Sequence, residues 1–129
     1  RQHFLERSPK DWDGWLAAAS GDVLCMVVLR ALEAHLIAGH RVEIWSGCPD
    51  VIRDVTEEWL TVHGIDPEIL ARMRPAGDRR PDVMLKREWL MEARANGGGP
   101  DLVYDDRDSV VAMWREEGVA CFQVAPGAF

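Results

Sequence analysis

The stretch DLVYDDRDSVVAMWREEGVACFQV, residues 101–124, has the pattern of a strand, a helix and a second strand. Its apolar start, LVY, predicts a buried strand that ends in two acids, Asp105 and Asp106. Residues 107–118 have the amphipathic period of a short helix that ends at glycine, and residues 119–124 predict another strand. Two strands joined through a helix predict a parallel pair with a right-handed crossover.

The preceding residues repeat this alternation of helices and strands. Their predicted elements are a helix over residues 22–38, a strand over 42–45 that breaks at Ser46-Gly47, a helix from Pro49 to Gly64, a short extended piece over 70–73 and a helix that Pro81 opens. The apolar positions expected to face the core on the first two helices are Val23, Val27, Leu32 (or Val28), Leu36, Val51, Ile52, Val55, Trp59 and Leu60. The pattern predicts an α/β domain with a mainly parallel sheet covered by helices on both faces.

The composition fits one soluble domain of 129 residues, spanning residues 1–129. No apolar run approaches the roughly 20 residues of a membrane span. The three cysteines, Cys25, Cys48 and Cys121, fit neither a disulfide framework nor a zinc knuckle, which favours a reducing, cytoplasmic setting. With 15 Lys and Arg against 22 Asp and Glu, the net charge of −7 argues against a protein that coats nucleic acid, but not against one that recognises a terminal phosphate.

Ligands of parallel sheets bind beyond the carboxyl ends of the strands, so the residues directly after each strand are candidates for the site. These are Ser46-Gly47, Met73-Arg74, Asp105-Asp106 and Ala125-Pro126. The adjacent carboxylates of Asp105 and Asp106 repel each other unless a cation or hydrogen-bond donors offset the charge, and Mg²⁺ is the natural partner. The alternative is that one of them caps the following helix while the other is solvated.

Several other residues have both a structural and a functional interpretation. Ser46 either caps the following helix or hydrogen-bonds to a phosphate oxygen at the helix start. Lys86, one turn inside the third helix, is either a solvated surface charge or a ligand. Core packing explains the tryptophans on the predicted apolar stripes, Trp59, Trp89 and Trp114.

The segment DWDGWL at residues 11–16 imitates D-x-D-G-x-L, the signature of a phosphatase nucleophile. That signature belongs at the end of a buried strand, and the charged, proline-broken ERSPK before it cannot be a central strand. We therefore expect Asp11 and Asp13 in a loop or helix start. Trp12 and Trp15 either stack on a base or pack against the sheet edge.

The order of these motifs resembles that of haloacid dehalogenase-type phosphatases. Ser46-Gly47 is followed by GDRRPDVMLK with Lys86, then by VYDDRDSVVAMWREEGV with Asp105 and Asp106, and finally by CFQVAPGAF. More narrowly, nearly the whole chain is similar to the 3′-phosphatase domain of phage polynucleotide kinase. The resemblance implies a three-layer Rossmann-like sandwich, in a phage protein expressed in the cytoplasm of a bacterial host.

The resemblance also implies Mg²⁺-dependent hydrolysis of phosphomonoesters in two steps. An aspartate attacks the phosphorus, and water then hydrolyses the aspartyl-phosphate. By the same resemblance, the Ser46 hydroxyl holds a phosphate oxygen and Lys86 steadies both nucleophile and phosphate. Asp106, with Asp105 beside it, matches the acidic pair that holds the metal.

Further roles follow from the same resemblance. Asp82, one helical turn before Lys86, is expected to orient that lysine, and Gly47 belongs to the phosphate-binding turn. Arg7 and Arg74 fall where the family places arginines that contact substrate. Cys48 stands where the family usually has arginine, and a thiol cannot make the bidentate phosphate contact of a guanidinium.

The nucleophile strand of the family, which ends in Asp-x-Asp-Gly-Thr, should lie shortly before Arg7 and is not found in the sequence. Loss of a central strand would expose two rows of unpaired backbone groups. We therefore expect the strand to come from upstream residues of the natural protein or from a partner chain, including a second copy. The third alternative is a degenerate relative with a rearranged sheet.

The leading functional interpretation is a phosphatase that acts on 3′-phosphorylated nucleic-acid ends. Two alternatives remain open: a small-molecule or mononucleotide phosphatase, and a catalytically inactive domain that binds phosphorylated ends or a partner chain. No membrane partner is expected. Nothing in the sequence matches the G-x-x-x-x-G-K-[ST] loop of a kinase.

Overall fold

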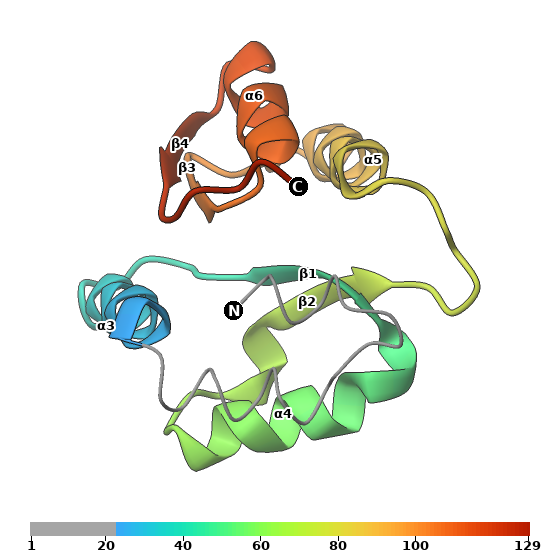
Figure 1. The fold of residues 1–129 in the computed structure, drawn as a ribbon. Helices are drawn as coiled ribbons and strands as arrows, with labels where there is room; N and C mark the ends of the chain where they lie inside the picture. Colours follow the sequence, from blue (N-terminus) through green and yellow to red (C-terminus); the bar gives the residue numbers. More distant parts are fainter. Residues whose placement is uncertain (1–22) are drawn as a thin grey trace. The chain divides into compact units, whose positions relative to one another are not determined.

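The computed structural model describes residues 23–129, which fall into two compact units with their boundary between Gly77 and Asp78 (Figure 1). The first unit contains α3 (Val23–Ile37), β1 (Ile44–Pro49), the 3₁₀ turn η1 (Asp50–Ile52), α4 (Arg53–Val62), the 3₁₀ turn η2 (Pro67–Ile69) and β2 (Leu70–Arg74). The second contains α5 (Asp82–Ala95), β3 (Leu102–Asp105), α6 (Asp108–Glu116) and β4 (Ala120–Gln123).

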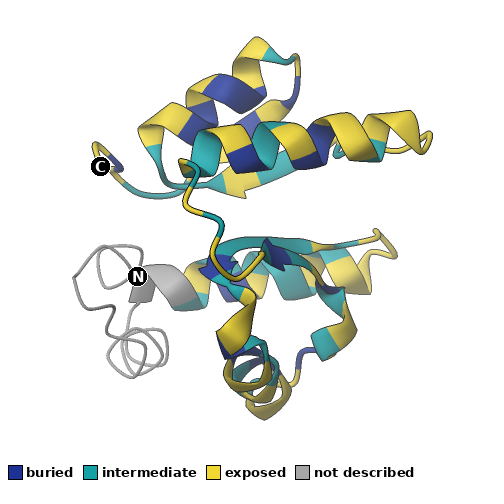
Figure 2. Cartoon of the chain, turned by 90° about the vertical axis from the view of Figure 1, so that its right-hand side faces the viewer, coloured by how far each residue is buried: buried dark blue, intermediate teal, exposed yellow. Residues whose placement is uncertain are grey.

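The first unit is built on the parallel pair of β1 and β2, in which Ile44 lies opposite Leu70 and Ser46 opposite Met73. Apolar side chains from both strands, from the helices and from the turns form one core. Its buried members are Leu29, Cys48, Ile52, Leu60, Ile65, Leu70 and Met73. Figure 2 shows how buried and exposed positions alternate along these elements.

The two helices of this unit bury faces that differ in part from the predicted ones. On α3, Leu29 is buried and the predicted Leu32 packs against the core, whereas Val27 and Leu36 are exposed. The helix carries apolar residues on all sides, so the period of its sequence does not single out one face. The prediction for Val23 concerns a side chain outside those that the structure describes.

On α4, Ile52 and Leu60 are buried as predicted, and Trp59 packs against the core. Val51 and Val55 are exposed, contrary to the prediction. Residues 50–52 form a 3₁₀ turn, which has about three residues per turn. The prediction assumed the α-helical spacing for these residues, so it misplaced the buried face at the start of the segment.

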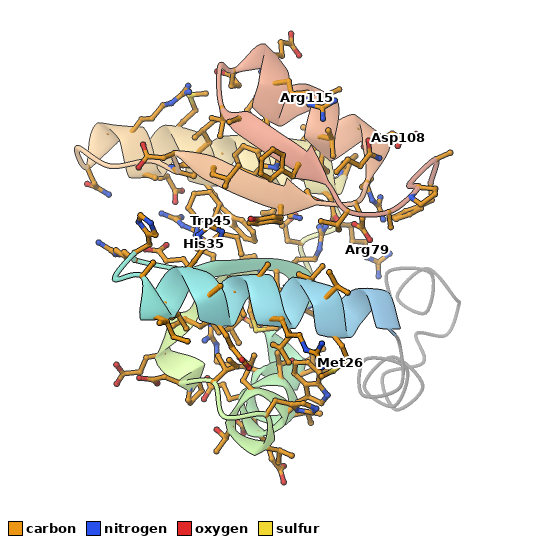
Figure 3. All side chains as sticks on the ribbon, turned by 90° about the vertical axis from the view of Figure 1, so that its left-hand side faces the viewer. Met26, His35, Trp45, Arg79, Asp108 and Arg115 are labelled. Atoms are coloured by element: carbon orange, nitrogen blue, oxygen red, sulfur yellow. The ribbon has the colours of Figure 1, made fainter. Side chains whose placement is uncertain are left out.

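The second unit is built on the parallel pair of β3 and β4, which runs without a register shift from Leu102 opposite Ala120 to Asp105 opposite Gln123. Helix α6 packs on both β4 and α5. Arg115, labelled in Figure 3, donates to the Cys121 carbonyl oxygen at 3.1 Å and ties the last turn of α6 to β4. The buried side chains of α5 and α6 are Leu85, Trp89, Leu90, Val110, Val111, Met113 and Trp114.

The predicted α/β class with parallel strands is confirmed, and the described strands form two parallel pairs. Three local predictions were wrong. Strand β1 does not break at Ser46-Gly47 but continues to Pro49, which precedes a 3₁₀ turn instead of occupying the first position of an α-helix. Strand β3 is half-buried instead of buried, because alternate side chains such as Tyr104 point away from the helices that cover its other face.

In the part of the chain that the structure describes, every helix is too short or too polar to span a bilayer.

The packing of α5 makes a simple stability prediction. Leu85 is fully buried, whereas its neighbour Met84 is 53% exposed. Leu85→Ala should lower the free energy of unfolding by about 2 to 5 kcal/mol because it leaves a cavity in the core of the second unit. Met84→Ala is the matched control and should change it by less than about 0.5 kcal/mol. Denaturation in urea measures both; equal effects would contradict the packing described here.

Candidate active site

The carboxylate of Asp105, at the end of β3, is the meeting point of three elements. One of its oxygens, Oδ2, accepts a hydrogen bond from Lys86 Nζ of α5 at 3.1 Å and from Trp114 Nε1 of α6 at 3.3 Å. The side chains of Lys86 and Asp105 are only 12% and 9% exposed. This is therefore a nearly buried ion pair, supported by a buried indole, and not a surface contact.

The other oxygen of Asp105, Oδ1, is directed at the backbone of the turn that follows β3. It accepts from the N–H of Asp106 at 2.9 Å and, more weakly, from the N–H of Arg107 at 3.5 Å. Both oxygens of Asp105 are thus engaged by the protein itself. Asp105 is therefore neither a solvated acid nor a cap of α6: helix α6 has no side-chain cap, and Oδ2 neutralises Lys86.

Asp106 has the opposite environment. Its burial, and next the negative charge of Asp105, raise the pKa of its carboxyl group, while Lys86 partly offsets the effect. A half-buried carboxylate next to a second carboxylate is a place where a cation would lower the electrostatic cost. Hydrogen bonds and Lys86 compensate the charge of Asp105, which gives that residue a structural role. The carboxylate of Asp106 is less well compensated, so a bound cation would stabilise it.

The structure rules out one of the two interpretations of Lys86 and shows what lies near Asp82. Lys86 is not a solvated surface charge, because Asp105 holds it in a nearly buried position. The helix places Asp82 one turn before Lys86, and its carboxylate lies 3.8 Å from Nε of Arg107. The expected role of Asp82 in orienting Lys86 stays a prediction.

The phosphate-binding residues predicted around β1 lie together in the first unit. The Ser46 hydroxyl accepts a hydrogen bond from the Cys48 N–H at 3.1 Å, a local turn and not a cap of α4. Arg74, at the end of β2, donates through Nε to the Gly47 carbonyl oxygen at 2.8 Å. The parallel pairing of β1 and β2 therefore joins Ser46, Gly47 and Arg74, while Cys48 is buried in the core.

Some sequence predictions fall outside these two clusters. Arg7, like Asp11, Asp13, Trp12 and Trp15, lies outside the described residues. Within residues 23–129, no three His, Cys, Asp or Glu side chains gather as a ready-made metal site.

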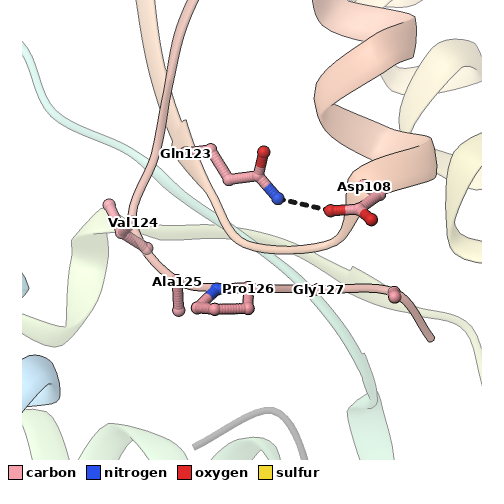
Figure 4. A pocket seen from close by; sticks show the side chains of 7 residues that line it. Asp108, Gln123, Val124, Ala125, Pro126 and Gly127 are labelled. Atoms are coloured by element: carbon pink, nitrogen blue, oxygen red, sulfur yellow. Dashed lines mark hydrogen bonds between the residues drawn. The ribbon is translucent and has the colours of Figure 1, made fainter.

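Sequence reasoning missed three residues that contact the acidic turn. Trp114 was predicted only as a core residue, and its indole N–H donates to Asp105 as well. Gln123 and Gly127 contact the backbone of the turn from the C-terminal segment. A pocket lined by Asp108 and residues 123–128 adjoins the turn, and neither Lys86 nor Asp105 lines it (Figure 4).

The sequence profile of the polynucleotide kinase PNKP phosphatase domain matches residues 2–129. The chain belongs to this family. The haloacid dehalogenase-type phosphatase family predicted from the motifs is therefore confirmed.

Solved structures agree with this assignment. A chain of the Pnkp1/Rnl/Hen1 complex is 34% identical, with a TM-score of 0.73 over 81% of this chain and 36% of that one. A chain of the Pnkp1/Rnl/Hen1 RNA repair complex is 30% identical, with a TM-score of 0.65 over 84% of this chain and 34% of that one. The present chain thus spans about a third of the length of these relatives.

The raised pKa of Asp106 makes a stability prediction. The carboxyl group of the unfolded chain ionises at a lower pH, so ionised Asp106 disfavours the folded state at pH 7, and this cost disappears as the pH falls below about 4. Asp106→Asn should therefore raise the free energy of unfolding at pH 7 by about 0.5 to 2 kcal/mol. The gain should shrink as the pH is lowered.

Chemical denaturation between pH 4 and pH 8 measures this difference. Asp101→Asn is the control, because Asp101 is an exposed acid just before β3. It should show no comparable gain. A destabilised Asp106→Asn protein at pH 7 would contradict the environment described for Asp106.

Proposed function

We propose that this chain is the phosphatase part of an enzyme that removes 3′-phosphates from nucleic-acid ends with Mg²⁺. The observation that carries the proposal is the cluster of Lys86, Asp105 and Asp106 at the carboxyl end of β3, in a chain of the PNKP phosphatase family. Ligands of parallel α/β folds bind at such strand ends. The cluster combines the fixed ammonium group of Lys86 with the carboxylate of Asp106, which favours the binding of a second cation.

The donor set fits Mg²⁺, which prefers carboxylate oxygens and is usually held by one or two carboxylates together with substrate phosphate. Asp106 is the proposed principal ligand, because both oxygens of Asp105 already accept hydrogen bonds from the protein. Asp105 is the proposed second member of the pair. A bound Mg²⁺ would neutralise negative charge on the phosphate oxygens.

The proposed reaction has two steps. An aspartate oxygen forms a bond to phosphorus as the bond to the 3′ oxygen breaks, and the leaving oxygen takes up a proton. Water then attacks the phosphorus of the aspartyl-phosphate, which releases inorganic phosphate and regenerates the carboxylate. No residue of this chain is proposed as the attacking aspartate.

The residues of the chain have proposed roles in charge stabilisation and binding. The Lys86 ammonium, held by Asp105, would face the negative charge that develops during transfer. The Ser46 hydroxyl would donate a hydrogen bond to a phosphate oxygen, with Gly47 in the same turn. Arg74 and Arg7 would contact substrate. Arg74 is already tied to the Gly47 carbonyl, which would fix its position.

RNA is the proposed nucleic acid, because the solved relatives belong to an RNA repair complex. The net charge of −7 suits recognition of a terminal phosphate better than coating of a long strand. By the same relation, we propose that the chain acts alongside partner chains in end repair. These interactions would take place in the cytoplasm.

The test is phosphate release from a 3′-phosphorylated RNA oligonucleotide, with and without Mg²⁺, by the natural protein that contains this chain. Release should require Mg²⁺. Asp106→Asn and Lys86→Met should each lower kcat by about 100- to 1,000-fold. Asp106→Asn is the more informative of the two variants, because the protein should remain folded. Asp101→Asn is the control and should keep full activity.

The other outcomes separate the alternatives. Faster hydrolysis of a 3′-mononucleotide than of the oligonucleotide would identify a mononucleotide phosphatase. Binding of 3′-phosphorylated RNA without release, unaffected by Asp106→Asn, would identify a binding domain. Full release by the Asp106→Asn protein would contradict the proposal.

A further inference from the structure

The last residues of the chain pack along the acidic turn that follows β3. The N–H of Val124 donates to the carbonyl oxygen of Asp105 at 3.1 Å, and the N–H of Asp108 donates to the carbonyl oxygen of Gly127 at 2.8 Å. The C-terminal segment is thereby hydrogen-bonded to both ends of the turn. Asp106 lies between these two attachment points.

Gln123, at the end of β4, bridges the same turn through its side chain. Its amide nitrogen donates to the carbonyl oxygen of Asp106 at 3.0 Å and to the carboxylate of Asp108, the contact drawn in Figure 4. The in-register pairing of β3 with β4 sets Gln123 opposite Asp105. One amide group therefore restrains the backbone of Asp106 directly.

Gly127 restrains the turn because it packs closely against the backbone of Asp106 and Arg107. It is buried, and a Cβ atom placed on it would lie 1.7 Å from the carbonyl oxygen of Asp106 and 2.8 Å from Cα of Arg107. These are backbone atoms, which cannot move aside as a flexible side chain would. Its φ is not in the left-handed region, so the close contact, and not the backbone conformation, requires glycine.

Phe129 adds a contact beyond the glycine. The guanidinium carbon of Arg107 lies 4.6 Å from the centre of the Phe129 ring, a cation–π geometry. The segment thus contacts all four residues of the turn, Asp105 to Asp108. None of these contacts involves the carboxylate of Asp106, which they leave available.

We infer that residues 123–129 form a positioning strap that holds Asp106 in the orientation needed for the metal, with Gln123 and Gly127 as positioning residues. This inference rests on the proposed function, because it takes Asp106 as the metal ligand. Residues that orient a metal ligand typically change metal affinity or activity by about 10- to 100-fold when they are mutated. Effects of that size, without unfolding, are what the strap should produce.

The test measures Mn²⁺ binding by electron paramagnetic resonance, with Mn²⁺ as the probe for the Mg²⁺ site, and phosphate release in parallel. Gly127→Ala should weaken Mn²⁺ binding by about 10- to 100-fold and lower kcat by a similar factor. Gln123→Glu keeps the size of the side chain but removes the donor, and should weaken Mn²⁺ binding by about 10-fold.

Gly98→Ala is the matched control for the glycine, because a Cβ there meets only one atom, at an ordinary 3.5 Å. It should leave Mn²⁺ binding unchanged. The Gln123→Glu protein keeps the test valid if the Gly127→Ala protein misfolds. Gln123 is exposed, so its replacement should leave the protein folded. Hydrogen exchange at the Asp108 and Val124 amides, which the strap protects, should accelerate in the Gly127→Ala protein.

If the wild-type protein binds Mn²⁺ and releases phosphate, and both strap variants do so equally well, the strap inference is wrong and the proposed function stands. If the wild-type protein neither binds Mn²⁺ nor releases phosphate, the proposed function fails and the inference fails with it. Loss of Mn²⁺ binding in both variants with an unchanged Gly98→Ala control supports the strap.

Discussion

The ion pair between Lys86 and Asp105 is the interaction on which the second unit depends. Helix α5 supplies the ammonium, β3 the carboxylate, and α6 the indole N–H of Trp114 that bonds to the same oxygen. A nearly buried ion pair costs desolvation energy, which is offset only when geometry and additional hydrogen bonds are good. Asp105 meets this condition, because backbone N–H groups satisfy its second oxygen. The same contacts fix Lys86 at the strand end, where the proposed chemistry needs a cation.

The two adjacent acids consequently have different tasks. Asp105 is compensated by the protein, whereas burial, and next the charge of Asp105, raise the pKa of Asp106. Asp106 is therefore a destabilising acid at neutral pH, a property common among functional residues and unexpected in a purely structural one. The C-terminal segment then restrains the backbone of Asp106 without neutralising its carboxylate. The turn from Asp105 to Asp108 therefore contains both the ion-pair residue that stabilises the second unit and the proposed metal ligand.

The sequence predicted the parts of this arrangement that depend on local pattern. The strand that reaches Asp105 and the helix carrying Lys86 followed from pattern and spacing, and the family followed from the resemblance of the motifs; the structure and the comparisons agree. Contacts between elements were not predictable in the same way. An apolar stripe identifies Trp114 as a core residue but does not show where its N–H points, and the need for glycine at position 127 arises from a tertiary approach. For the same reason, helical spacing could not reveal that Arg107 lies near Asp82.

A double-mutant cycle on Lys86 and Asp105 tests the central claim most directly, with the free energy of unfolding at pH 7 as the measured quantity. Lys86→Met and Asp105→Asn should each destabilise the protein by about 3 to 5 kcal/mol, because each leaves a buried charge or donor without its partner. The double variant should be more stable than the sum of the two losses predicts, by about 1 to 3 kcal/mol. Strictly additive losses would contradict the claim that this ion pair organises the second unit.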